Sequence, residues 1–289
     1  MTAFYPAIFV FLWATGFLGA KLSAPYADPL AFLAVRFAIV SAILAAVVLL
    51  MRLPWPTARQ AGNAMIAGIL IQGLYLGGVF WAIDKGMPAG VSALIVGLQP
   101  ILTALLARPI LGEPIAARHW LGLGIGLIGL VLVLGPKLEF SGQGITPATI
   151  VANLIGVIAI TLGSIWQKKT AGHLDTRVDG VFQFAAGSAI VALGALFGES
   201  YDFIWAPELI FALVWLVLVL SIGAITLYLI MLRQGAVSRV AALFYLVPAV
   251  AAFFGWVLFG ETLTLVQIAG MAITVAAVAL VSKAKAAET

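Results

Sequence analysis

Arg36 is the only charged side chain that falls well inside one of the long apolar segments of this chain. At a rise of about 1.5 Å per residue, it would lie about 10 Å below the nearer surface of a bilayer that the segment crossed. Ionisable groups at such depth are costly and usually functional. A guanidinium there could bind the carboxylate of a small solute, or it could tie helix ends together through backbone carbonyls or through Asp28.

The acidic residues point away from proton chemistry. All eleven Asp and Glu residues fall in loops, at the termini or at the ends of apolar segments. A relay of buried carboxylates through the membrane is therefore not expected. Facilitated diffusion, exchange, or coupling through a group other than a carboxylate stays open.

Catalytic and metal chemistry is not expected either. The chain has no cysteine and only two histidines, His119 and His173, so disulfides and thiolate sites are excluded and a transition-metal centre is not expected. No nucleophile or acid/base cluster lies within the apolar segments. We therefore predict no catalytic residue, no metal, no cofactor and no enzyme. The formal net charge of +4 indicates membrane topology rather than nucleic-acid binding.

Most of the chain consists of segments that match the thickness of a bilayer. Hydrophobic residues make up 64% of the 289 residues and charged residues 9%, against about 25% charged residues in soluble domains. A membrane-spanning helix needs about 20 apolar residues. We expect an all-α integral membrane protein with ten such helices near residues 4–22, 29–51, 62–83, 88–107, 118–135, 148–167, 178–198, 208–231, 237–258 and 263–281.

The basic residues predict the orientation of these helices. With ten helices, eleven Lys and Arg residues fall on the side that also holds both termini, and only Lys21, Lys85 and Lys137 fall on the other side. Cytoplasmic loops carry the excess of Lys and Arg. We therefore predict a multi-pass protein of the bacterial inner (cytoplasmic) membrane with both termini in the cytoplasm.

The two halves of the chain repeat one another. The stretch GFLGAK at 16–21 and Arg36-Phe37-Ala38 recur 147 residues later as GSIWQK at 163–168 and Gln183-Phe184-Ala185. Each unit holds five apolar segments, so the second unit must enter the membrane with the opposite orientation. Inverted repeats of this kind are typical of transporters. We place the units at residues 1–135 and 148–289, joined by an external linker at 136–147.

The repeat favours structural roles for four polar residues. Gln183 stands where Arg36 stands in the first unit, which favours a polar position that holds helices together. Gly112-Glu113 recurs 148 residues later as Gly260-Glu261, and we expect each pair to turn the chain and to place a carboxylate near a helix N-terminus. The predicted structural set is Arg36, Gln183, Glu113 and Glu261.

Several of these residues carry a resemblance to a known family. Trp13, Asp28-Pro29 followed by Arg36-Phe37, and the Pro100…Leu111-Gly112-Glu113 block with its echo Pro248…Phe259-Gly260-Glu261 resemble the EamA-type members of the drug/metabolite transporter superfamily. The nearest subgroup is the YddG-like amino-acid exporters. The resemblance implies ten helices and efflux of small metabolites, often amino acids. It also implies a central cavity lined mainly by the first, third, fourth, sixth, eighth and ninth helices, with the fifth and tenth as scaffold.

Polar and aromatic residues near the middle of those cavity helices are the candidate ligands. Gln72 and Tyr75 are three residues apart and so share one face of a helix. Interhelical packing is about as good an interpretation of any single one as ligand contact, but the uncharged, aromatic-rich set suits a neutral or zwitterionic solute. The predicted substrate-binding set is Trp13, Gln72, Tyr75, Gln99, Ser221 and Tyr245, and the predicted gate or hinge residues are Pro100, Pro248, Trp166 and Tyr228.

Together these features predict a secondary transporter that exports small neutral or zwitterionic metabolites, amino acids foremost, by alternating access between two inverted repeats. Export of sugars, nucleosides or amphiphilic drugs is the main alternative within transporters. A passive channel and a membrane-embedded enzyme are the alternatives outside that class. The expected partners are the small-molecule substrate and the lipid bilayer, not nucleic acid, and the oligomeric state is left open, a monomer being compatible.

Overall fold

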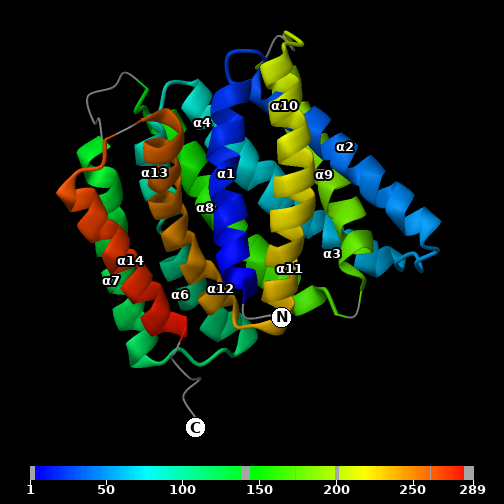
Figure 1. The fold of residues 1–289 in the computed structure, drawn as a ribbon. Helices are drawn as coiled ribbons and strands as arrows, with labels where there is room; N and C mark the ends of the chain where they lie inside the picture. Colours follow the sequence, from blue (N-terminus) through cyan, green and yellow to red (C-terminus); the bar gives the residue numbers. More distant parts are fainter. Residues whose placement is uncertain (1–3, 138–143, 173, 199–201, 261, 283–289) are drawn as a thin grey trace.

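Membrane-length helices make up the computed structural model, which describes residues 4–137, 144–172, 174–198, 202–260 and 262–282 (Figure 1). Nine helices in these ranges are long and apolar enough to cross a membrane, and the first helix adds the apolar stretch Tyr5–Gly16. The predicted all-α fold, with ten membrane helices in an inverted five-plus-five repeat, is confirmed. The first five helices are α1 (Tyr5–Ser23), α2 (Pro29–Leu50), a third built from α3 (Ala58–Gly68), η2 (Ile69–Leu76) and α4 (Gly77–Asp84), a fourth built from α5 (Ala89–Val96) and α6 (Gln99–Leu111), and α7 (Ala117–Leu134). The second five are α8 (Pro147–Thr170), α9 (Thr176–Leu196), an eighth built from α10 (Pro207–Trp215), η4 (Leu216–Ala224) and α11 (Ile225–Gln234), a ninth built from α12 (Val237–Ala242), η5 (Leu243–Tyr245) and α13 (Leu246–Phe259), and α14 (Leu265–Ser282).

Local signals explain where these helices begin and end. The third helix begins at Ala58 rather than near residue 62, because Thr57 and Gln60 form a capping box there. Thr146 and Thr149 form another at the start of α8, where Pro147 takes the first helical position. Gly112 ends α6 in the left-handed conformation, with φ of 69°, which glycine adopts without a steric penalty.

Four helices depart from regular α geometry, and they do so in pairs related by the repeat. The third and eighth helices each contain a π-helical segment, η2 and η4, whose first residues are 147 positions apart. The fourth helix breaks at Gly97 and Leu98, and the ninth tightens into the 3₁₀ turn η5. π-Helical and 3₁₀ segments within helices often mark functional sites or hinges.

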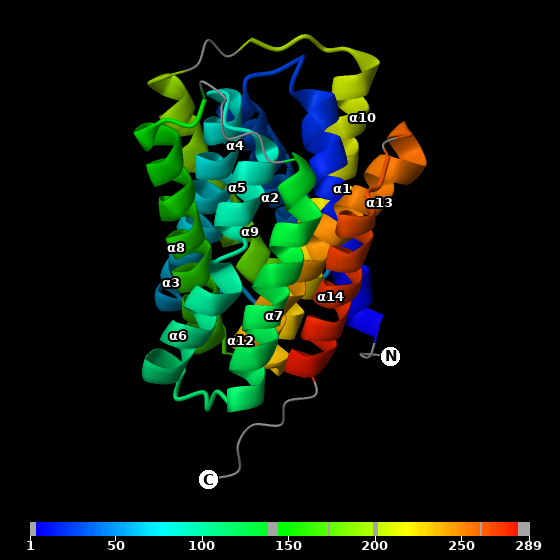
Figure 2. The ribbon, with the colours of Figure 1, turned by 90° about the vertical axis from the view of Figure 1, so that its left-hand side faces the viewer.

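Equivalent helices of the two repeats also pack against each other. α2 lies along α9, and α7 lies along α14 (Figures 1 and 2). Hydroxyl groups join the first pair, since Ser41 donates to the carbonyl of Val181 at 2.9 Å and Ser188 donates to that of Ala34 at 2.8 Å. Glycines let the second pair approach closely, as small residues do between membrane helices. A Cβ on Gly270 would stand 2.9 Å from the carbonyl oxygen of Gly129.

The bundle has two ends that matter for the site. The proximal end, as we name it, holds the start of α1 and the end of α14, and Figure 1 shows both at the bottom. The distal end holds the connections from α1 to α2 and from α4 to α5. Which end faces the cytoplasm stays a prediction from the basic residues, as do the boundaries of the two repeat units and the linker.

Candidate functional site

A cavity of about 480 Å³ runs from the distal end into the middle of the bundle. Exposed residues Ala24, Asp84 and Ala89 stand at its mouth, and Trp13 and Tyr75, both largely buried, stand at its floor. α1, α2, the third helix, the start of α5 and the eighth helix supply the walls. The volume falls in the range of small-molecule sites, about 300–1,000 Å³. The resemblance implied no part for α2, so its place in the wall differs from that expectation.

Arg36 is the charged residue deep in this cavity. Its side chain is 1% exposed and lines the wall contributed by α2. The Nε group donates a hydrogen bond of 3.0 Å to Ser221 Oγ on η4, whereas the buried Nη2 group has no hydrogen-bond partner in the part of the chain that the structure describes. Among the described residues of the lining, the other charged one is Asp84, which lies at the mouth and pairs with Lys85 at 3.0 Å.

Four aromatic rings close the bundle on the proximal side of the cavity floor. Phe9 and Trp13 of α1, Tyr228 of α11 and Phe244 of η5 contact one another with centroid distances between 5.1 and 5.9 Å. All four rings are buried. The Tyr228 hydroxyl adds a hydrogen bond of 2.5 Å to Ser164 Oγ on α8. We call these four rings the aromatic plug.

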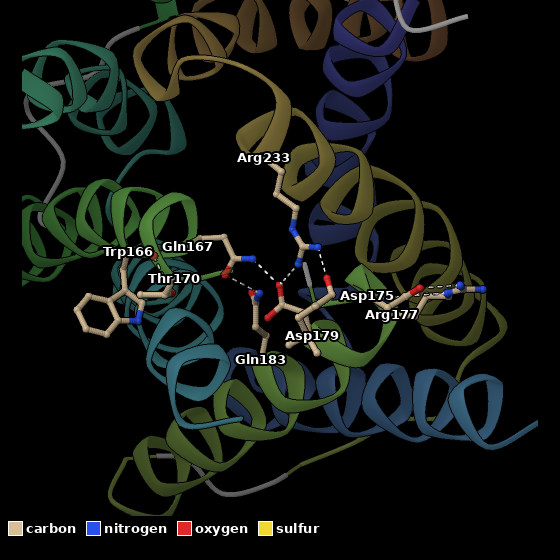
Figure 3. A network of polar contacts seen from close by, with 9 residues as sticks. Trp166, Gln167, Thr170, Asp175, Arg177, Asp179, Gln183 and Arg233 are labelled. Atoms are coloured by element: carbon tan, nitrogen blue, oxygen red, sulfur yellow. Dashed lines mark hydrogen bonds and ion pairs between the residues drawn. The ribbon is translucent and has the colours of Figure 1, made fainter. Parts of the chain in front are cut away.

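A buried polar network joins three helices at the proximal end, beyond the plug (Figure 3). Arg233, at the end of α11, pairs with Asp179 of α9 at 2.6 Å. Gln167 of α8 donates to the same carboxylate and accepts a hydrogen bond of 3.1 Å from Gln183. We call Gln167, Asp179, Gln183 and Arg233 the proximal latch, because they tie α8, α9 and α11 together.

Two neighbouring contacts strengthen that end. Lys168 donates to the carbonyls of Arg233 and Gly235, at 3.0 and 2.9 Å. Asp175 lies beside the latch and pairs with Arg177 at 2.8 Å (Figure 3). The hydrogen bonds and charge of Arg177 lower the pKa of the Asp175 carboxyl below its ordinary value.

The predicted substrate-binding residues separate into two groups. Trp13 and Tyr75 line the cavity floor, and Ser221 lies just behind the lining, where it accepts the hydrogen bond from Arg36. The remaining three are buried outside the lining. Gln72 packs on Gly187 of α9, Gln99 donates to Thr103 at 3.1 Å, and Tyr245 packs on Gly126 of α7.

The predicted gate residues occupy three kinds of position. Tyr228 belongs to the aromatic plug. Trp166 donates a hydrogen bond of 3.2 Å to the carbonyl of Asn63 and so joins α8 to α3; it points away from the latch (Figure 3). Pro100 and Pro248 each lie in the first turn of the helical segment that follows the irregularity, α6 and α13 respectively.

The predicted structural residues also lie in different places. Gln183 belongs to the latch, and Arg36 lies on the cavity wall. Glu113 accepts a hydrogen bond of 3.1 Å from the backbone amide of Val237, so its carboxylate caps α12 rather than α7, the helix that follows it in the chain. Glu261 lies outside the described residues.

Sequence reasoning missed the other latch residues. Asp179 and Arg233 stand at helix ends on the same predicted side of the membrane, which is the only signal that the sequence carries for their pairing. They are 54 residues apart, and no spacing rule connects them. Gln167 lies within the repeated GSIWQK stretch, but nothing in that stretch indicates a partner on α9.

The sequence model of the EamA-like transporter family matches this chain twice, over residues 1–135 and over residues 146–283. The chain belongs to the EamA-like transporter family. Membership makes it a transmembrane transporter rather than an enzyme, and a multi-pass membrane protein. It confirms the resemblance that the Pro…Gly-Glu blocks carried.

Relatives of this EamA-family chain span nearly its whole length. The uncharacterized inner membrane transporter YedA of Escherichia coli K12 is 27% identical over 95% of the chain and 88% of YedA. The uncharacterized transporter YvbV of Bacillus subtilis is 26% identical over 99% of the chain and 93% of YvbV. A probable amino-acid metabolite efflux pump of Salmonella typhimurium is 26% identical over 94% of the chain and 92% of the pump.

A crystal structure with 23% sequence identity superposes with a TM-score of 0.79 and covers 97% of this chain and 96% of the other. At that identity the likeness speaks for the fold alone. The ten-helix arrangement is therefore shared, and the cavity residues must be interpreted from this chain itself.

Proposed function

We propose that this EamA-family transporter exports small metabolites, amino acids foremost, across the inner membrane by alternating access. The observation that carries the proposal is a one-sided cavity. It is open at the distal end, and the aromatic plug and the proximal latch close the bundle on the other side of its floor. A passive channel would need a continuous path through both ends.

The excess of basic residues at the proximal end makes that end cytoplasmic under the positive-inside rule. The cavity then faces the outside, as expected of an exporter that has just released its substrate. The name of the Salmonella relative, a probable amino-acid metabolite efflux pump, supports amino acids as the first substrates to test.

In the proposed cycle, substrate from the cytoplasm reaches the cavity floor once the latch and the plug have separated. The third, fourth, eighth and ninth helices accommodate this motion through their π-helical segments and breaks. Their irregular backbone is where a helix bends at least cost. In the same step the distal mouth closes, which gives a state whose cavity is open only at the proximal end.

Buried polar atoms without partners support a second state. Both amide atoms of Gln72, the Oε1 of Gln99 and the hydroxyl of Tyr245 have no hydrogen-bond partner in the described part of the chain. Each such group costs about 1–3 kcal/mol when it is left unpaired. Opening the proximal side would bring water or substrate to these atoms. In that state the predicted binding residues Gln72, Gln99 and Tyr245 would line the transport path.

The test uses purified protein in liposomes preloaded with labelled amino acids of different classes. Saturable efflux that unlabelled amino acids compete with, and that needs the protein, is the expected result. Flux that grows in proportion to concentration without saturation would indicate a channel. Absence of flux for every amino acid would refute the substrate class, and sugars, nucleosides and amphiphilic drugs would then be tested in the same liposomes.

Sidedness is tested separately through cysteine accessibility. The chain has no cysteine, so a single cysteine at Ala24 reports the distal mouth without background. A maleimide that cannot cross the inner membrane should label this cysteine when it is added to cells whose outer membrane has been permeabilised. Labelling that occurs only after the inner membrane is permeabilised would show that the distal end faces the cytoplasm, opposite to the predicted orientation.

A further inference from the structure

We propose that Arg36 binds the carboxylate of the transported metabolite, so that the cavity selects solutes with a free carboxylate and does not require a free amine. The inference rests on the proposed function, because it specifies the ligand of the same cavity. It also reverses the structural role that the repeat favoured for Arg36.

No carboxylate of the described residues compensates the charge of Arg36, whose guanidinium lies 5.4 Å from the centroid of the Phe37 ring. Ion pairs among the described residues join Lys85 to Asp84, Arg177 to Asp175 and Arg233 to Asp179, and none involves Arg36. Ser221, its side-chain hydrogen-bond partner, is a neutral hydroxyl. A buried cation inside a membrane normally has a partner charge or serves a solute path. The cavity is where that partner can arrive.

The geometry of the guanidinium also suits an anion from the cavity. Ser221 accepts from the Nε group, while Nη2 is buried beside the cavity wall and has no hydrogen-bond partner among the described residues. Had Arg36 served to tie helix ends together, the Nη2 donors would meet backbone carbonyls. Arg and carboxylate groups form strong charge-assisted hydrogen bonds, often through two parallel contacts.

The charge count favours one carboxylate over a phosphate. Among the described residues of the cavity lining, Arg36 is the only basic one. A carboxylate balances one guanidinium, whereas a phosphate dianion would leave a net negative charge in a buried site, which is costly. The rest of the deep wall, with Trp13, Phe32, Tyr75 and Ile225, offers rings and an aliphatic side chain for an apolar body.

The described residues of the lining offer the amine of an amino acid no acidic partner at this depth. Asp84, the acidic residue of the lining, lies at the mouth and nine residues along the third helix from Tyr75, which corresponds to about 13 Å at 1.5 Å per residue. In an amino acid the ammonium and carboxylate share one carbon neighbour, so a carboxylate on Arg36 leaves the ammonium far from Asp84. Acylation of the amine should therefore be tolerated, and amidation of the carboxylate should not.

The experiment compares phenylalanine, N-acetylphenylalanine and phenylalaninamide on the wild-type protein. Each is tested as a competitor of whichever labelled amino acid the liposome panel shows to be exported, and as a ligand of the detergent-purified protein by calorimetry. We expect the first two to compete within a few-fold of each other and the amide to be at least about 10-fold weaker, as loss of a charge-assisted contact implies. Equal competition by the acid and the amide would overturn the inference while leaving amino-acid export intact.

Variants then assign the effect to the residue. Arg36→Gln should bring the affinity for the acid down to that for the amide, and Arg36→Lys should keep part of the difference. Arg59→Gln is the matched control, because Arg59 is an exposed cation of α3. This variant should keep the full difference in affinity between the acid and the amide. Persistence of the full preference in folded Arg36→Gln would overturn the assignment. If no amino acid is exported or bound by the wild type, the proposed function fails first, and this inference fails with it.

Discussion

Removal of the Asp179 charge should release the proximal end of the transporter. The Asp179 and Arg233 side chains are 2% and 19% exposed. Breaking a fully buried ion pair by removing one partner costs about 3–5 kcal/mol, and the partial exposure of Arg233 reduces this to about 1–3 kcal/mol through solvent screening. The cost falls on the state in which the latch is closed, since under the proposed cycle the pair separates in the other state.

Each 1.4 kcal/mol changes an equilibrium constant by about tenfold, so a cost of about 1–3 kcal/mol means that Asp179→Asn should raise the ratio of the proximally open to the closed state by about 5- to 150-fold. A cysteine at Ser164, which is buried and contacts Tyr228 of the plug, reports that ratio through its rate of maleimide labelling. The rate should rise by the same factor when Asp179→Asn is added to the Ser164→Cys background.

Asp175→Asn in the same background is the matched control. Asp175 pairs with Arg177 at the same end of the bundle, outside the latch, and asparagine also caps helices well. Its labelling rate should stay at the starting value. Equal rates for Asp179→Asn and Asp175→Asn would refute the latch, because the buried pair would then contribute nothing specific to closure.

Three further predictions follow from contacts outside the cavity. Gly270→Ala should destabilise the protein by about 1–3 kcal/mol, because the new methyl group meets backbone atoms of α7, whereas Gly124→Ala, which meets nothing within 4 Å, should not lower the thermal unfolding midpoint. Glu113→Ala should cost about 1 kcal/mol through loss of the α12 cap, and Glu113→Gln should cost less because an acceptor oxygen remains; unfolding in detergent measures both. The pairing of Asp175 with Arg177 lowers the carboxyl pKa, so its contribution is present above the ordinary carboxyl pKa and is lost as pH falls through the lowered value. The difference in unfolding midpoint between wild type and Asp175→Asn should therefore shrink over that acidic range, and a constant difference would contradict it.

The sequence predicts the membrane architecture well, because the bilayer fixes the length of every spanning helix and forces its backbone hydrogen bonds inward. Pro100 and Pro248 also indicate where two helices break. The face that each residue presents is harder to predict. Residue spacing places Tyr75 and Gln72 on one face of an α-helix, yet both lie in the π-helical segment η2, and the structure puts Tyr75 on the cavity floor and Gln72 against α9.

Pairing between helices is the other part that the sequence does not determine. Arg36 is recognisable from its depth, but only packing shows that α2 turns it toward the cavity instead of toward a carbonyl. Asp179 and Arg233 each look like an ordinary charge at a helix end. Their meeting depends on how α9 and α11 cross, which no local pattern encodes.

Because the irregular segments of the helices occur in pairs, the conformation of each half is a template for the other half in the opposite state of the proposed cycle. The π-helical segments of the third and eighth helices stand at equivalent positions, and the fourth and ninth helices break at equivalent places but in different ways, with a turn at Gly97 and Leu98 in one and η5 in the other. Under the proposed cycle, each half would assume the shape that its counterpart has now, and we then expect the mouth to close and the latch to part. Coordinates for that second conformation can thus be built by exchanging the two halves, with no other template.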